Sequence, residues 1–269
     1  MSIIKNKSQD KQIESILEYF RDEKGRNAFY QFYKDLADMY EVISPDVFLR
    51  PYIDDYDTLT RMYRIIKEAY DPGLILDREL TRKTARLVQE HTKTDKIKST
   101  LDIYEINENT LKKLEESSAS DIERVFNLLK SIYKAVEKES ANNPYLISIK
   151  ERAELVSNLF RERQKTTEET LEELKKIVEE INNAKEERER KGLDGEAFSI
   201  YWILKNKEIP NPEDKAKEME TLLKYYPYWK ISEEQEREVR MKTYRILQGL
   251  KNQTEIVDEI FRILRSVIK

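Results

Sequence analysis

The chain has 269 residues, of which 39% are hydrophobic and 38% charged, and its formal net charge is -4 with a pI of about 5.5. This length can bury a core of its own, and the slightly acidic balance excludes the global basic field that holds proteins on phosphate backbones or anionic lipid. Cysteine is absent, which excludes disulfides and thiolate chemistry, and five glycines and seven prolines among so many charges favour long helices over sheet. We therefore expect an all-α fold, a multi-helix bundle.

The first nine residues form a polar leader that we expect to be disordered. The N-terminal sequence MSIIKNKSQDK lacks the apolar core of a secretion signal, and no later stretch is long and apolar enough to span a membrane. The sequence therefore predicts a cytoplasmic protein with no membrane partner.

Residues 10–92 are expected to form an N-terminal helical lobe. A short apolar stripe between Ile13 and Phe20 is followed by a broad one from Ala28 to Ile43, and both predict buried helices. Pro45 and Pro51 interrupt the pattern, which resumes from Tyr56 to Tyr70 and ends at Asp71-Pro72-Gly73. A fourth helix is predicted over residues 78–89. The polar stretch HTKTDKIKST, residues 91–100, is the candidate linker between lobes.

Residues 93–269 are expected to form a C-terminal helical lobe, with at most a minor extended piece near 101–106. The pairs Ser120/Glu123 and Ser148/Glu151 fit the capping box, which predicts a helix start at each serine. The longest predicted helix covers about 166–190; it should be partly exposed and end at Gly192. Further helices are expected near Asp194, at Pro212 and over 255–268.

The stretch SEEQEREVRMK, residues 232–242, is typical of a solvated helix. Ser232 and Gln235 form another capping-box pair, and the acids precede the bases, as the helix dipole favours. Three acid-first pairs are spaced (i, i+4): Glu233 with Arg237, Glu236 with Arg240, and Glu238 with Lys242. Helix physics therefore accounts for nearly every charge here.

Catalytic and metal motifs match poorly. A phosphate-binding Walker loop requires Gly-Lys before Ser or Thr, whereas the five glycines precede Arg26, Leu74, Leu193, Glu196 and Leu250. Pro45-Asp46 and Glu173-Leu-Lys175 match the letters of a restriction-type nuclease, but the second pair falls inside a predicted helix. His91 has no second imidazole or thiol to share a metal, and the acids Asp54, Asp55 and Asp57 are typical of a helix N-terminus. We expect no catalytic, cofactor or metal site.

One local cluster resembles a base-stacking platform. Tyr225, Tyr226, Tyr228 and Trp229 are flanked by Lys224 and Lys230. Aromatic residues between helices more often fold back as a lid on the core, so three interpretations stay open: a lid, a partner hot spot and a stacking platform.

Six phrases, in this order, resemble the C-terminal helical region of the R subunit of type I restriction enzymes: FLRPYIDDYDTLTRMYRIIKEAY, LTRKTARLVQEH, LDIYEINENTLKKL, ERAELVSNLFRERQKTTEETLEELKKIVEEI, KGLDGEAFSIYWILK and SEEQEREVRMKTYRIL. The resemblance covers nearly the whole chain from about Asp10. It implies upstream nuclease and ATP-driven motor domains, whose motifs are not found here, and partners in the methyltransferase and specificity subunits. No catalytic residue of that family has a matching position.

The resulting hypothesis is a non-catalytic helical assembly module that docks the R subunit on the methyltransferase and specificity core. The alternative is a direct DNA-binding module, with duplex DNA as an ancillary partner. A coiled-coil adaptor built on 166–190 is a third interpretation, weakened because its stripe breaks at Lys185 after about two heptads. The residues expected to contact a partner or DNA are Tyr226, Tyr228, Trp229, Arg237, Arg240 and Arg245.

Overall fold

The computed structural model describes residues 9–43, 47–71 and 102–266. Every regular element in these ranges is helical: eleven α-helices and one 3-10 helix, so the all-α prediction is confirmed. Residues 102–106 form no strand. The expected leader, the helix at 78–89, the linker at 91–100 and His91 lie outside the described residues.

The chain folds into two compact units, each assembled from stretches that are not consecutive in sequence. Unit 1 holds the described residues up to Tyr104 together with Leu111–Lys130 and Val156–Leu174, and unit 2 holds Glu105–Thr110, Ser131–Leu155 and Lys175–Lys269. This partition differs from the two consecutive lobes expected from the sequence, whose boundary near residue 92 falls outside the described residues.

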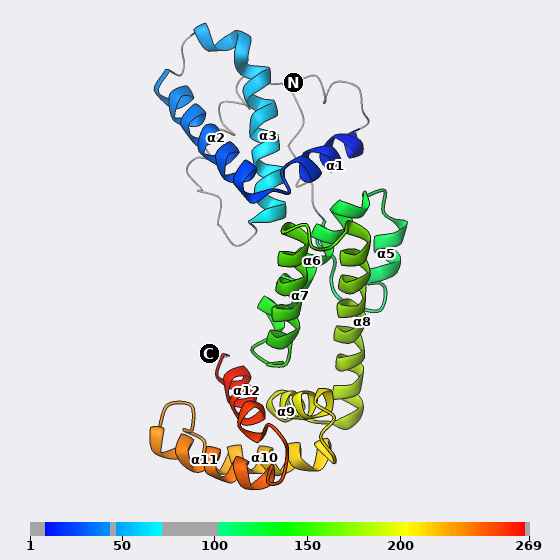
Figure 1. The fold of residues 1–269 in the computed structure, drawn as a ribbon, viewed down its shortest axis with the longest axis vertical. Helices are drawn as coiled ribbons and strands as arrows, with labels where there is room; N and C mark the ends of the chain where they lie inside the picture. The colour runs from blue at the N-terminus through cyan, green and yellow to red at the C-terminus, as the bar shows by residue number, and fades with distance from the viewer. Residues whose placement is uncertain (1–8, 44–46, 72–101, 267–269) are drawn as a thin grey trace. The chain divides into compact units, whose positions relative to one another are not determined.

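Unit 1 begins with four elements (Figure 1): α1 (Gln9–Tyr19), α2 (Glu23–Ile43), η1 (Val47–Tyr52) and α3 (Ile53–Tyr70). Tyrosine side chains join α2 to α3. Tyr33 of α2 stacks on Tyr63 of α3 with ring centroids 4.3 Å apart, and its hydroxyl donates to Thr60 Oγ1 at 3.0 Å. Tyr40 stacks on Tyr56 at 3.9 Å. These rings bury large apolar areas and fix the pairing of α2 with α3.

The rest of unit 1 comes from α5 (Thr110–Glu116) and from parts of α6 (Asp121–Glu139), α7 (Leu146–Arg161) and α8 (Thr167–Lys191). Glu123 confirms the helix start predicted at Ser120, because its Oε2 accepts from the Ser120 N–H at 2.9 Å. The start predicted at Ser148 is wrong: α7 begins at Leu146, and the Ser148 hydroxyl donates to the Tyr145 carbonyl instead of capping. A capping box at Thr166 and Glu169, not predicted, starts α8.

Unit 2 is centred on α9 (Gly195–Asn206), whose residues from Ala197 to Leu204 are all buried. It also holds α10 (Pro212–Tyr225), α11 (Glu233–Ile246) and α12 (Gln253–Arg265). The starts expected at Asp194 and Pro212 are confirmed; Asp194 caps α9 by accepting from the Ala197 N–H at 2.8 Å. Gly192 ends α8 at φ 63°, as the sequence predicts.

The N-terminus of α9 lies directly against the loop after α6. A Cβ built on Gly195 would stand 1.9 Å from the Asn142 carbonyl oxygen, so only glycine permits this approach. The Ser199 hydroxyl accepts from the Tyr145 N–H at 2.9 Å, and Tyr145 packs edge-on against Phe198. This contact brings the loop, residues 141–144, beside the first turn of α9.

Candidate functional site

The aromatic cluster of the sequence lies in the loop between α10 and α11, and hydrogen bonds fix the loop. Ser232 caps α11, accepting from the Gln235 N–H at 3.4 Å. The expected return bond from Gln235 to the Ser232 N–H is replaced: Gln235 Oε1 accepts from the Tyr228 N–H at 2.9 Å. The Ser232 N–H donates to the Tyr228 carbonyl at 2.8 Å. The first turn of α11 therefore holds the aromatic loop in place.

Trp229 is the residue of this loop that folds back as a lid on the core. Its side chain is 3% exposed and packs edge-on against Phe261 of α12, with ring centroids 5.3 Å apart. In this conformation its ring is covered and cannot stack on a base. Tyr228, by contrast, is 61% exposed, and Ile231 is 84% exposed. The loop thus buries one aromatic residue and presents its neighbours to solvent.

Lys242 of α11 holds Tyr226. Its Nζ donates to the Tyr226 hydroxyl at 2.8 Å and lies 4.9 Å from the centre of that ring. This hydrogen bond is the main cause that raises the pKa of Lys242 above its usual range. Tyr226 packs edge-on against the exposed Tyr225 at 4.9 Å, so the two rings and the ammonium form one surface group.

The three candidate arginines of α11 have different surroundings. Arg240 is already engaged: it pairs with Glu236 at 3.2 Å and Asp258 at 2.7 Å and covers the ring of Phe261 at 4.5 Å. Arg237 and Arg245 are exposed, and within the described ranges their side chains form no ion pair. Of the three predicted acid-first pairs, Glu236–Arg240 is formed. Of these three arginines, Arg237 and Arg245 are thus available to a ligand.

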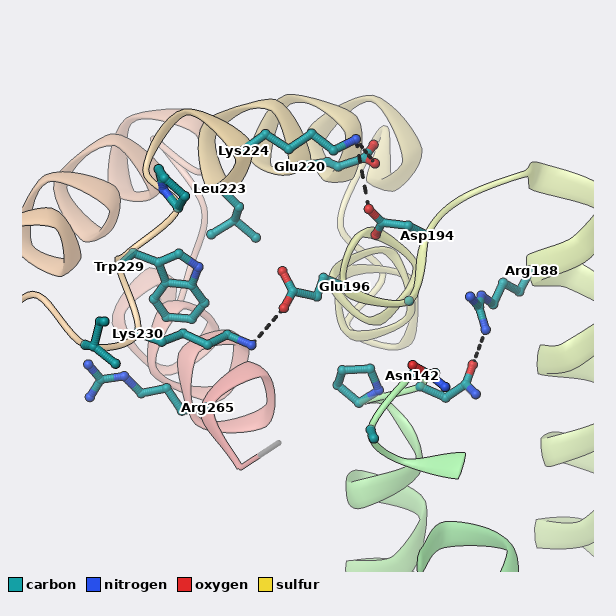
Figure 2. A pocket seen from close by; sticks show the side chains of 16 residues that line it. Asn142, Arg188, Asp194, Glu196, Glu220, Leu223, Lys224, Trp229, Lys230 and Arg265 are labelled. Atoms are coloured by element: carbon teal, nitrogen blue, oxygen red, sulfur yellow. Dashed lines mark hydrogen bonds and ion pairs between the residues drawn. The ribbon is translucent and has the colours of Figure 1, made fainter. Parts of the chain in front are cut away.

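A hollow of about 1060 Å³ opens beside the loop, entirely within unit 2 (Figure 2). Trp229, Lys230 and Ile231 form one wall, the C-terminal turn of α10 a second, and the loop 141–144 with the start of α9 a third. Arg188 of α8 and Arg265 of α12 complete the lining. Residues from six separate stretches of sequence therefore converge here.

The charges around the hollow are mostly matched in pairs. Lys230 pairs with Glu196 at 2.7 Å, and Lys224 pairs with Glu220 at 2.6 Å and with Asp194 at 4.0 Å (Figure 2). Such exposed pairs contribute little stability, about 0–1 kcal/mol each. The pairs hold these charged side chains in place. The apolar residues Leu223, Pro227 and Ile231 lie between them.

Arg188 is the exception among these charges. Its guanidinium donates to the Asn143 side-chain oxygen and, at 3.4 Å, to the Leu193 carbonyl, both of which are neutral. Within the described part of the chain, no carboxylate pairs with it. A carboxylate from a partner would therefore meet a cation held in place by neutral acceptors.

The hollow gathers only some of the predicted residues. Trp229 lines it, and Tyr226 and Tyr228 belong to the same loop, whereas Arg237, Arg240 and Arg245 lie on α11 and do not line it. Arg188, Asp194 and Glu196 line the hollow but were not among the predicted site residues. The N-cap pattern at Asp194 was a usable signal for the α9 terminus, but no local pattern indicates that α8 supplies an arginine.

The weaker motif matches have structural explanations. Glu173 lies inside α8 and pairs with Lys165, and Asp57 pairs with Arg61 at 2.6 Å in α3. Among the described residues no group of three or more acidic or histidine side chains could hold a metal ion. No described helix has the length and apolarity needed to cross a membrane.

Comparisons with protein families, with curated proteins and with solved structures find no match to this chain.

Proposed function

We propose that the chain is a non-catalytic helical assembly module that docks a type I restriction R subunit on its methyltransferase and specificity core. The family and its partners come from the six phrases of sequence quoted above. The structural support is one observation: Tyr228 and Ile231 are exposed on the loop that forms one wall of a hollow, and the apolar residues lining this hollow lie between charged neighbours that are fixed in pairs. An exposed tyrosine beside a preformed depression that is lined by arginine is typical of an interface hot spot.

The proposed contact uses the loop as a rigid element. Gln235 and the Trp229 lid already fix the backbone of this loop. Binding of a partner therefore costs little additional conformational entropy for ordering the loop. An apolar side chain of the partner would enter the hollow, and a partner carboxylate would pair with Arg188. The cellular location proposed with this role is the cytoplasm.

The test is a binding titration of the full chain against purified methyltransferase plus specificity subunits, with and without duplex DNA. We expect saturable binding that does not require DNA. The double variant Tyr228→Ala, Ile231→Ser should weaken it by about tenfold or more, since central hot-spot residues each contribute more than about 1 kcal/mol.

The matched control is Leu155→Ser, which removes an apolar side chain of α7 that is 58% exposed and does not line the hollow. It should bind as the unchanged chain does. Binding that appears only with DNA would favour the DNA-binding alternative. No binding in either condition, or ATP hydrolysis or DNA cleavage by the chain alone that a point substitution abolishes, would refute the proposal.

A further inference from the structure

We draw no further inference here: the strongest candidate, the exposed apolar edge of α2 around Phe32 and Met39 in unit 1, carries none because nothing in the part of the chain that the structure describes shows what covers it.

Discussion

Arg26 is a buried arginine that joins α1 to the core of unit 1. Its Nη1 donates to the carbonyls of Phe20, at 3.1 Å, and Arg21, at 2.5 Å, and its guanidinium covers the ring of Tyr70 at 4.3 Å. Truncation to alanine leaves carbonyls at the C-terminal end of α1 without their donor and removes the ring contact. We expect Arg26→Ala to lower the free energy of unfolding by about 2–4 kcal/mol.

Urea denaturation followed by circular dichroism measures this loss. Lys24→Ala is the control, because Lys24 is exposed on the same helix and should change stability by no more than about 0.5 kcal/mol. Equal midpoints for the two variants would show that the buried guanidinium contributes nothing.

A second prediction concerns the substitution of Gly195. Any side chain would collide with the Asn142 carbonyl, so Gly195→Ala must push α9 away from the loop 141–144. We expect a loss of about 3 kcal/mol or more in the free energy of unfolding. Gly25→Ala is the matched control, because its nearest neighbour is the flexible Asp22 carboxylate at 3.3 Å and alanine favours helix. A loss no larger than that of Gly25→Ala would contradict the close contact.

At the scale of elements, Glu213 connects α10 to α8. Hydrogen bonds from Lys191, then from Lys217, lower the pKa of Glu213 to about 2. Because the folded pKa lies below the unfolded value, the carboxylate contributes stability above about pH 4.5 and loses it as pH falls toward 2. We therefore expect Glu213→Gln to lower Tm near pH 7, and the difference from the unchanged chain to disappear toward pH 2.

Thermal unfolding between pH 7 and about pH 2.5 checks this, a range that spans the unfolded pKa and approaches the folded one. Glu218→Gln serves as the control, since Glu218 is an exposed carboxylate of α10 without an ion pair among the described residues. A Tm difference for Glu213→Gln that stays constant with pH, or that grows as pH falls, would contradict the role of the two lysines.

The sequence predicts helices best where local chemistry decides. Asp194, Pro212 and Gly192 mark helix termini through side-chain and backbone preferences that act within a few residues. The prediction at Ser148 failed because its hydroxyl had a second local partner, the Tyr145 carbonyl, and the helix could begin earlier. The return bond predicted for Gln235 failed for the same reason, since the Tyr228 N–H competed with that of Ser232. Local patterns thus predict a cap but not which of two nearby partners it takes.

At the scale of the whole molecule, apolar stripes predict which faces can be buried but not what covers them. The stripe of α2 shows this, because α3 covers one edge and Phe32 and Met39 stay exposed. The hollow shows it again: Arg188 and Trp229 are 41 positions apart, and only tertiary packing brings both to its lining. Fold class was therefore predictable from sequence, whereas the composition of the candidate site depended on contacts between distant residues.

Net charge gives the last prediction, which concerns DNA. With a formal net charge of -4 and Arg240 paired to two acids, Arg237 and Arg245 are the α11 arginines left to meet phosphate. Each phosphate neutralised contributes about 0.9 to the slope of log K against log salt concentration. We expect any binding of duplex DNA to show a slope no steeper than about -3, and Arg237→Gln with Arg245→Gln to flatten it by about 2. A slope of about -6 or steeper, unchanged in that variant, would mean that a basic surface elsewhere in the chain binds the DNA.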